Sequence, residues 1–508
     1  MEVELKLLIR PEHIASFKKH PLLRKHALSP SIEQDQTDIY FDTPDQELKR
    51  CGAGLRVRQA GNVWTQTFKA GENAGSGLYQ WQEWESVVHG PEPDLHLLRK
   101  MIGVHAACGE LISSHKIAAR LRPIFNVTVR RTIWQLRLPA GDEIECVLDE
   151  GRIDNLARSA PISEIELELK SGNVLHIFDF ALALLEKVPL RIGNQSKAAR
   201  GYALNSHTEC SAVSAKDLVL SKGMTIHQAF EAIAENCLQQ IQANAPCLGQ
   251  SNSLEGLHQM RIGLRRLRSA LALFQGMIAV PDELREELDW LSAAISAARD
   301  WDMLATKTLE SIKIDDVEGY IDVKEAALEK AAALHKVAAE TIDSDRYTHL
   351  MLSLTRWLQS NEGRESLPRL KRKDMKKSLK IFSQHMLEHD RRRLIKRGRQ
   401  LKDADARARH RVRIAAKKMR YDTEFFQSLY ATKASKQYVA ALSVLQDRLG
   451  GLNDIAVGEK LLMQIERGRP EMTRITSFIR GYLAARAAEE EQKIKKMWGK
   501  FKSAHLPR

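Results

Sequence analysis

Polar and apolar residues alternate with a period of two along much of the first 205 residues. The opening segment divides its side chains between opposite faces of an extended chain: Glu2, Glu4 and Lys6 against Val3, Leu5 and Leu7. The alternation returns at residues 55–58, 64–69, 83–85, 143–149 and 164–169. This period is typical of strands with two unlike faces. Residues 11–19 and 174–185 instead have helical spacing, so we expect strands with flanking helices.

Beyond residue 225 the pattern becomes helical almost throughout. Amphipathic helices, some of them interrupted, are predicted at residues 226–245, 255–274, 282–299, 302–312, 323–358, 374–402, 404–429 and 436–449. Residues 204–225 break the strand pattern and are rich in small and polar residues, which places a domain boundary there. A chain of 508 residues also exceeds what one hydrophobic core organises. We therefore predict an α+β protein with one domain at residues 1–205, a linker at 206–224 and an all-α domain at 225–508.

The helical half contains an internal repeat. Two sets of residues have identical offsets: His258, Arg261, Arg265 and Arg268, and His410, Arg413, Lys417 and Arg420. A similar acidic element follows each set, Arg299-Asp300 in the first case and Asn453-Asp454 in the second. Steps of three and four residues return to one face of a helix, so each set forms a basic stripe. Two homologous helical bundles that face one another would explain the repeat.

The positive charge of the chain is concentrated in this helical half. The formal net charge is +13. Residues 1–210 carry 26 Lys and Arg against 27 Asp and Glu, whereas the remainder carries 52 against 38. A basic domain attracts nucleic acid, anionic lipid or another polyanion, and charge alone does not choose among them. The stripes hold few aromatic residues for base stacking, which disfavours single-stranded nucleic acid as the main ligand.

Cysteine spacing and hydropathy predict a cytoplasmic protein. The six cysteines lie far apart and form neither a Cys-X-X-Cys pair nor a zinc-spaced set with histidine, which fits a reduced setting. The first residues lack the apolar core of a signal peptide, and no stretch approaches the roughly 20 apolar residues of a membrane span. We therefore expect no membrane partner.

The charged residues of the predicted strands are segregated by sign. There are acidic triplets (Glu143, Glu145, Asp149 and Glu164, Glu166, Glu168) and basic sets (Arg56, Arg58, Lys69, Arg131). A solvated face is the ordinary interpretation of one such strand. Like charges side by side repel, however, unless opposite charge or bound ions neutralise them. If the charged faces line a closed barrel, carboxylates would bind hard divalent cations and Arg and Lys would bind phosphate oxygens.

Six short motifs in this half together resemble the CYTH, or triphosphate tunnel metalloenzyme, family. They are Glu2-Val3-Glu4-Leu5-Lys6, Tyr40-Phe41-Asp42-Thr43-Pro44, Gly54-Leu55-Arg56-Val57-Arg58, Thr67-Phe68-Lys69, Glu164-Ile165-Glu166-Leu167-Glu168 and Ser196-Lys197-Ala198-Ala199-Arg200-Gly201-Tyr202. The resemblance is closest to bacterial inorganic triphosphatases that join this domain to a helical one. It implies an antiparallel β-barrel, or tunnel, with flanking helices.

The resemblance also implies roles for individual residues. Four carboxylates would hold Mg²⁺ or Mn²⁺: Glu2, Glu4, Glu166 and Glu168. Seven cations would bind the triphosphate: Lys6, Arg56, Arg58, Lys69, Arg131, Lys197 and Arg200. Glu83 and Glu145 would complete the acidic lining, and they join Glu2, Glu4 and Lys6 in the predicted catalytic set. The metal would neutralise developing phosphate charge and orient water for in-line attack.

Two positions depart from the family pattern. Trp81 stands where the family often has Arg before Glu83, and Ile133 stands where a second basic residue would follow Arg131. Either loss would weaken phosphate binding or shift the choice of substrate. Trp81 either fills space in a packed wall or stacks on an organic substrate group. Adenylate cyclisation and thiamine triphosphate hydrolysis therefore stay open beside inorganic triphosphatase activity.

The basic stripes resemble the CHAD domain, over residues from about 220 to the end. This resemblance implies two helical units whose basic faces bind inorganic polyphosphate. The motifs supply the predicted contacts: His258, Arg261, Arg265, Arg266 and Arg268, and His410, Arg413, Lys417, Lys418 and Arg420. Basic runs at residues 371–380 and 391–399 would extend the surface.

We therefore expect metal-dependent hydrolysis of inorganic triphosphate to diphosphate and phosphate, in the cytoplasm and at polyphosphate granules. Two other classes of protein remain as alternatives. A non-catalytic polyphosphate-binding or targeting protein would have a decayed tunnel, to which Trp81 and Ile133 would contribute. A nucleic-acid-binding protein would use the basic half.

Overall fold

The computed structural model describes residues 2–75, 77–102, 115–155, 157–205, 211–249, 253–312, 317–360, 362–365, 378–402 and 406–507. Backbone contacts divide the chain into two compact units. The first, called the tunnel unit below, comprises residues 1–209 and 343–360. The second, the helical unit, comprises residues 210–342 and 361–508. Parts of two predicted segments, 206–210 of the linker and 371–377 of a basic run, lie outside the described ranges.

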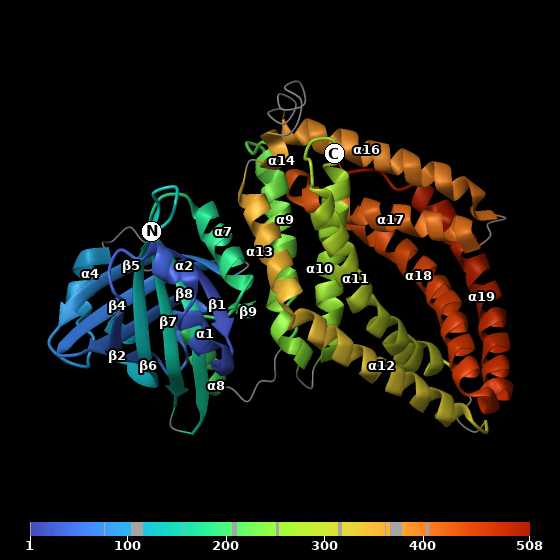
Figure 1. Ribbon diagram of the computed structural model, residues 1–508. Coiled ribbons are helices and arrows are strands. Elements are labelled where there is room, and N and C mark those ends of the chain that lie inside the picture. The colour runs from blue at the N-terminus through green and yellow to red at the C-terminus, as the bar shows by residue number, and fades with distance from the viewer. Residues whose placement is uncertain are drawn as a thin grey trace. The chain divides into compact units, whose positions relative to one another are not determined.

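Eight antiparallel strands close into a barrel in the tunnel unit (Figure 1). Neighbouring strands follow the order β5-β4-β3-β2-β6-β7-β8-β1, and pairing of β5 with β1 closes the ring. A short ninth strand, β9, continues beside β1 where β5 ends: β5 pairs with residues 2–5 and β9 with residues 7–9. The strands are β1 (Glu2–Ile9), β2 (Ile32–Asp42), β3 (Ala53–Ala60), β4 (Val63–Gly75), β5 (Leu78–Val88), β6 (Arg122–Arg137), β7 (Glu143–Asp154), β8 (Ser159–Ser171) and β9 (Leu190–Ile192).

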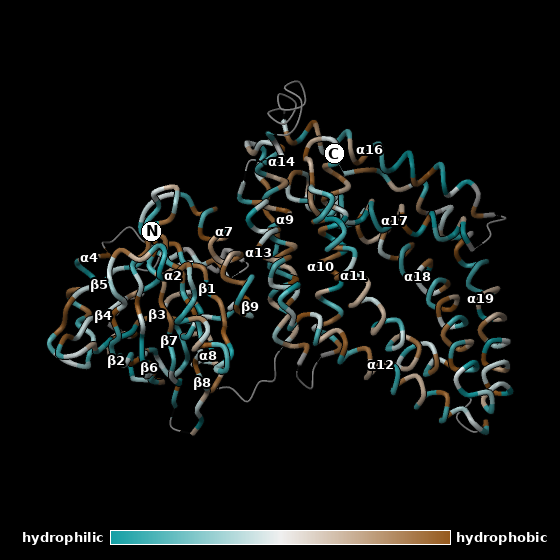
Figure 2. Tube along the Cα trace, in the orientation of Figure 1, coloured by the Kyte–Doolittle hydropathy of each residue, from teal (hydrophilic) through white to brown (hydrophobic). Residues whose placement is uncertain are grey.

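The strands turn their charged faces into the barrel, which confirms the prediction from alternation. On β1, Glu4 and Lys6 line the interior, whereas Leu5 and Leu7 are fully buried on the opposite face. Figure 2 shows the resulting change between hydrophilic and hydrophobic colour along the barrel strands. The inner face therefore gathers charges from many strands around one space.

Short helices cover the outside of the barrel. They are α1 (Ile14–Lys18), α2 (Pro21–His26), α3 (Glu47–Arg50), α4 (Leu95–Ile102), α6 (His115–Ala118), α7 (Val174–Leu185) and α8 (Lys197–Asn205), with a 3₁₀ turn at Pro11–His13. Helix α7 packs on β8 and β1, and α8 packs on β6 and β7. The helix predicted at 11–19 corresponds to the 3₁₀ turn at Pro11–His13 and to α1. The helix predicted at 174–185 corresponds to α7.

Asp42, at the end of β2, joins two of these helices. Its carboxylate accepts hydrogen bonds from the backbone N–H groups of Thr43 (2.7 Å), Leu48 (2.9 Å) and Lys49 (3.1 Å). It also accepts one from the hydroxyl of Tyr202 on α8, at 2.6 Å. A buried carboxylate with four donors is well satisfied. The Tyr40–Pro44 motif therefore fixes the loop and α3 beside α8.

The helical unit consists of two bundles with the same helix order. The first contains α9 (Ile226–Ala243), α10 (Ser253–Leu273), α11 (Asp282–Met303) and α12 (Tyr320–Ile342). The second contains α16 (Leu379–Gly398), α17 (Ala406–Phe426), α18 (Thr432–Gly468) and α19 (Thr473–Lys502). In each bundle every helix packs on the next one along the chain. The repeat predicted from the two basic stripes is thus a repeat of whole bundles.

Shorter elements complete this part of the chain. Turns of 3₁₀ helix lie at Ala245–Gly249, Arg399–Lys402, Gln427–Leu429 and Pro470–Met472, and one π-helical segment spans Leu304–Leu309. Helix α14 covers Glu362–Glu365. Helix α13 (Asp345–Gln359) follows α12 but belongs to the tunnel unit.

The limits of several predicted helices differ in the structure. The break predicted between residues 299 and 302 is absent, because α11 runs on to Met303 and directly into the π-helical segment. The single helix predicted at 323–358 is two helices, because Ser344 caps a new one: its side chain accepts the backbone N–H of Tyr347 at 3.2 Å. The helix predicted to end at residue 449 runs on to Gly468 through Gly450 and Gly451. Glycine weakens a helix by only about 1 kcal/mol, and the buried residues Leu449, Leu452 and Ile455 on either side outweigh that cost.

Among the described residues no helix is both long and apolar enough to cross a membrane. Cys51, Cys146 and Cys237 are free thiols. Cys247 is disulfide-bonded, so the expectation of fully reduced cysteines does not hold for this residue.

Candidate functional site

The barrel encloses a cavity of about 490 Å³ whose wall is densely charged. Every tunnel residue predicted from the sequence lines it except Arg200: Glu2, Glu4, Lys6, Arg56, Arg58, Lys69, Glu83, Arg131, Glu145, Glu166, Glu168 and Lys197. Arg200 lies nearby and donates to the carboxylate of Glu164 at 3.2 Å. The structure thus brings together carboxylates and cations that are up to 195 residues apart in the chain, Glu2 and Lys197 being the extremes.

Three carboxylates form a row across the wall. In the strand register Glu4 on β1 lies opposite Glu168 on β8, and Glu168 lies opposite Glu145 on β7. Gln135 on β6 ends the row and donates to Glu145 at 2.5 Å. Like charges at neighbouring positions repel. Lys170 on β8 pairs with Glu168 at 2.7 Å and with Glu145 at 3.6 Å, so one cation of these strands is shared by two carboxylates of the row.

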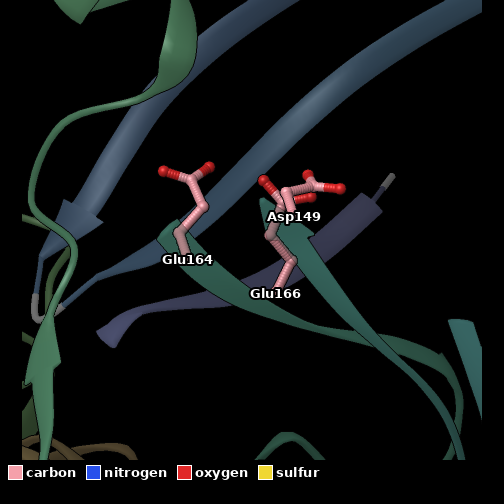
Figure 3. A group of neighbouring side chains, drawn as sticks. All are labelled: Asp149, Glu164 and Glu166. Atoms are coloured by element: carbon pink, nitrogen blue, oxygen red, sulfur yellow. The ribbon is translucent and has the colours of Figure 1, made fainter. Parts of the chain in front are cut away.

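A second acidic group lies deeper in the barrel and is neutralised by cations. Asp149, Glu164 and Glu166 offer carboxylate oxygens within 4.8 Å of one another, and Figure 3 shows them rising from the neighbouring strands β7 and β8. The ammonium of Lys197 lies 2.7, 2.6 and 2.8 Å from these three side chains in turn. Arg131 is bidentate to Asp149, at 2.8 and 2.7 Å, and Lys6 is paired with Glu164 and Glu166.

The pKa shifts of the carboxylates have opposite directions in different parts of the cavity wall. Burial opposes the charge on Glu166, but Lys197, Lys6 and Arg131 outweigh it and hold its pKa well below the usual value. The pKa values of Asp149 and Glu164 are lowered in the same way, with Lys197 as the largest favourable influence. Burial instead raises the pKa of Glu2, Glu4 and Glu168, and the nearby lysines offset only part of that effect. Glu2 and two members of the row, Glu4 and Glu168, are thus the carboxylates whose charge the nearby cations offset only in part.

These residues fit a hard divalent cation. All the donors are carboxylate oxygens, which Mg²⁺ and Mn²⁺ accept. Glu2, Glu4 and Glu168 have the charge deficit that such an ion would remove. The compact cluster in Figure 3 shares only Glu166 with the predicted metal ligands, and its centre already holds the ammonium of Lys197. The row is therefore the better place for a metal than the compact cluster.

The opposite wall supplies cations. Arg56 and Arg58 on β3 both pair with Asp38, which is fully buried on β2, and Lys69 on β4 pairs with Glu2 at 2.5 Å. Sequence analysis missed Asp38 as a site residue. It also named Asp149 and Glu164 as acidic residues without assigning them a role. The alternation of Gln36, Asp38 and Tyr40 puts Asp38 on the inner face, but its two arginine partners become visible only from the β2–β3 register.

The two departures from the family pattern both lie on the inner face. Trp81 lines the cavity, opposite Glu2 in the register, and stacks on Tyr79 with ring centroids 5.7 Å apart and planes at 11°. Ile133 lies opposite Val147, another lining residue. Trp81 is therefore packed against the wall on at least one face, as a space-filling aromatic would be.

In the helical unit, the stripes of α10 and α17 face one another. The pKa of Lys417 on α17 is lowered to about 6 by burial and then by Arg265, Arg413, Arg261 and Arg299. Burial and neighbouring cations also lower the pKa of Arg265 and Arg413. Seven arginines of the helical unit have a buried Nε atom with no hydrogen-bond partner among the described residues, and five of them belong to α10, α11 and α17: Arg261, Arg265, Arg299, Arg413 and Arg420. Cations with unused donors are what a polyanion requires.

Other predicted members of the stripes turn elsewhere. Arg266 is buried and donates to Gln240 and Asn236, both at 2.8 Å, with its guanidinium over the ring of Phe425. Lys418 pairs with Asp390 at 3.3 Å. Arg268 pairs with Asp289 at 2.6 Å on the surface. His258 and His410 stay on the stripes, and His410 contacts Asn453 at 3.3 Å. Arg299, on α11, joins the cluster and was not among the predicted contacts.

Comparison with known families finds two domains, in the order that the sequence predicted. The model of the CYTH domain matches residues 1–202, and the model of the CHAD domain matches residues 232–463. The inorganic triphosphatase of Haemophilus influenzae is 34% identical over 206 residues, which are 40% of this chain and 55% of that protein. The match thus spans little more than half of the relative's length.

Solved structures also resemble the chain. The CHAD domain from the plant Ricinus communis is 35% identical and aligns with a TM-score of 0.54, over 59% of this chain and 99% of that one. A putative adenylyl cyclase from Hippeastrum with a dominant triphosphatase activity aligns over 40% of this chain and 96% of that one, with 16% identity and a TM-score of 0.30. The chain joins a region that matches the CYTH domain to a CHAD domain, and it belongs to the CHAD family through its helical bundles.

Proposed function

We propose that the tunnel unit hydrolyses inorganic triphosphate to diphosphate and phosphate with Mg²⁺ or Mn²⁺. One observation carries the proposal: Glu2, Glu4 and Glu168, whose charge is only partly offset, share the barrel cavity with a wall of cations. Glu2, Glu4 and Glu168 would hold the metal, with Glu166 and Glu145 beside them. Such a metal neutralises charge that develops on the phosphoryl oxygens.

The remaining residues bind and orient the substrate. Arg56, Arg58 and Lys69 offer donors from one wall, and Lys6, Arg131, Lys197 and Arg200 offer them from the other. Phosphoryl transfer depends mainly on positioning and on charge stabilisation, and it needs no covalent nucleophile. Lys197 and Arg131 are held in place by Asp149 and Glu164, so they are ordered before the substrate arrives.

Phosphate release from the purified chain tests the proposal. Tripolyphosphate with Mg²⁺ or Mn²⁺ should be hydrolysed, and Glu4→Gln should reduce the rate at least a hundredfold. ATP and thiamine triphosphate at equal concentration separate the alternatives, because a cyclase would form cyclic AMP and a thiamine triphosphatase would prefer its own substrate. Absence of turnover of every substrate, in wild type and Glu4→Gln alike, would favour the non-catalytic alternative.

We further propose that the facing stripes of α10 and α17 bind inorganic polyphosphate. Supporting this are the cluster of Arg261, Arg265, Arg299, Arg413 and Lys417, and its unused donors. A flexible phosphate chain needs a dense array of cations and no base-stacking surface. Competition between long-chain polyphosphate and DNA or RNA at matched ionic strength decides between ligands. In cells, a fluorescent fusion should then collect at cytoplasmic polyphosphate granules.

A further inference from the structure

Helix α13 occupies an unusual place in the chain. It lies within the sequence that matches the CHAD domain and separates the two four-helix bundles, α9–α12 and α16–α19. It has no counterpart in either bundle. Its residues nevertheless group with the barrel, as part of the tunnel unit. A segment from the middle of the helical sequence thus completes the fold of the N-terminal domain.

Helix α13 packs on two elements of the tunnel unit. It lies against α7 and β9, and α7 lies in turn against β8 and β1. The order of layers is therefore barrel, α7 and α13. Nine of the fifteen residues of α13 are buried: Tyr347, Thr348, Leu350, Met351, Leu352, Leu354, Thr355, Trp357 and Leu358. This burial is that of the chain as a whole, and the contacts with α7 and β9 are what join the helix to the tunnel unit.

Ion pairs fix the orientation of α13 at both ends. Before its first turn, Asp343 pairs with Arg10 at 2.7 Å and with Arg191. In its last turn, Arg356 pairs with Asp179 on α7. Arg10 directly follows β1, and Arg191 lies on β9. Exposed ion pairs of this kind add little stability, but Asp343 joins the ends of two strands that carry or support the site.

A short path of backbone contacts leads from β9 to the cavity. β9 pairs with β1, with Leu8 opposite Arg191. The next residue after β9, Gly193, donates its N–H to the carbonyl of Lys6 at 2.9 Å. A Cβ atom at Gly193 would lie 2.6 Å from Cγ of Lys6, so the backbone touches that side chain directly. A displacement of β9 would therefore shift Lys6, which pairs with Glu164 and Glu166.

We propose that α13 is a positioning element of the triphosphate tunnel that the helical sequence supplies, and that Asp343 is its positioning residue. The helix holds β9 against β1 and thereby orders Lys6. Occupation of the tunnel then stabilises α13, which is covalently continuous with the helical unit through the peptide bonds at 342–343 and 360–361. Ligand binding in the tunnel is linked in this way to a segment in the middle of the CHAD sequence.

Hydrogen exchange of the full chain tests the assignment of α13. In low denaturant, amides of residues 345–359 should exchange in the same cooperative opening as α7 and β9. Tripolyphosphate, added together with a chelator that removes divalent metal, should slow hydrogen exchange in β1, β9 and α13 at least fivefold. Exchange of α13 together with α12 and α16, unaffected by tripolyphosphate, would overturn the proposal. Slowing of β1 and β9 without α13 would overturn it as well, whereas no slowing anywhere in the barrel would count against the tunnel as a triphosphate site.

Charge-reversal substitutions test the role of Asp343. Asp343→Arg should raise the KM for tripolyphosphate three- to tenfold, and Asp343→Glu should keep the wild-type value. Adding Arg191→Asp to Asp343→Arg should restore at least half of the loss. Glu340→Arg, a matched exposed reversal on α12, should change nothing. Equal effects of Asp343→Arg and Glu340→Arg, or no rescue by the double exchange, would remove Asp343 from the proposal.

Discussion

Glu4 on β1 and Glu168 on β8 lie directly opposite each other in the antiparallel register, in the wall of a buried cavity. Both have a raised pKa, chiefly because burial disfavours their charged forms. Like-charged partners at this distance destabilise a sheet. Lys170 pairs with Glu168 at 2.7 Å and offsets only part of the effect of burial. The pair therefore lowers the stability of the metal-free barrel and provides negative charge that binds a cation.

The first prediction concerns this pair. Glu168→Gln should raise the metal concentration for half-maximal hydrolysis at least tenfold, because one ligand oxygen loses its charge. The same substitution should raise the unfolding temperature of metal-free protein by a few degrees, since 1 kcal/mol corresponds to about 2–4 °C in a unit of this size. Titration of activity with Mn²⁺ and a thermal scan in chelator measure the two effects.

Glu143→Gln is the matched control for this variant. Glu143 lies on β7 but is 42% exposed and pairs with Arg137 on the surface. It should alter neither the metal requirement nor, by more than about 0.5 kcal/mol, the stability. A lower unfolding temperature for metal-free Glu168→Gln, with an unchanged metal requirement, would contradict the assignment of the row.

The second prediction concerns the neutralised cluster. Asp149→Asn should destabilise the tunnel unit at pH 7 by about 1.5–3 kcal/mol, because Arg131 loses its bidentate partner and Lys197 loses one of its three carboxylates. The folded-state pKa of Asp149 is depressed, so its stabilisation is fully present above the unfolded pKa of about 3.9 and is lost as pH falls through the folded value. Urea unfolding at pH 7 and at pH 3 should show a smaller difference between variant and wild type in acid. A difference that grows on acidification would be inconsistent with this account.

The third prediction concerns proton uptake by the helical unit. Lys417 has its pKa lowered to about 6, so it is mostly neutral at pH 7 while the site is empty. The cations around it are Arg261 and Arg265 on α10, Arg299 on α11 and Arg413 on α17, with Asp300 and Asp454 as the acids in the cluster. A bound polyanion favours the charged form, so binding should take up a proton and the affinity should fall as pH rises above 6.

Calorimetry in two buffers of different ionisation enthalpy measures this uptake. Long-chain polyphosphate should bind to wild type with about half a proton or more taken up per site at pH 7. Lys417→Arg should bind with little uptake, because an arginine stays charged. Equal uptake by wild type and Lys417→Arg would assign the proton to another group.

Local sequence patterns predicted much of the fold and of the tunnel, because strand alternation decides which side chains face inward. Helix α13 could not be placed in this way. Its hydrophobic pattern has the same helical period of about 3.6 residues as that of its neighbours, and no local sequence feature indicates that it packs on α7. Asp38 was missed for a similar reason, as its arginines come from another strand. Arg266 and Lys418 had a usable signal: neither falls on the three-and-four spacing of its stripe, and the family motif alone put them in the predicted set.

The last prediction uses the adjacent residues Arg265 and Arg266. Consecutive residues lie about 100° apart around a helix. Arg265 faces the cation cluster with an unpartnered Nε, whereas Arg266 is buried against Asn236, Gln240 and Phe425. Arg265→Met should therefore weaken polyphosphate binding about tenfold and lower the slope of log affinity against log salt by about 1, with little change in stability.

Arg266→Met should instead reduce stability and leave polyphosphate binding unchanged, because it leaves two buried amide oxygens without a donor. We expect a loss of about 2–3 kcal/mol in unfolding free energy and an unchanged salt slope. Fluorescence anisotropy with labelled polyphosphate between 50 and 300 mM salt, together with urea unfolding, separates the two outcomes. If Arg266→Met lowered the salt slope as much as Arg265→Met, residue 266 would belong to the binding face after all, and the side-chain arrangement of α10 would differ from the one described. If neither variant changed the slope, the phosphate chain would bind away from the facing stripes, since a cation that contacts phosphate must release counterions when it does so.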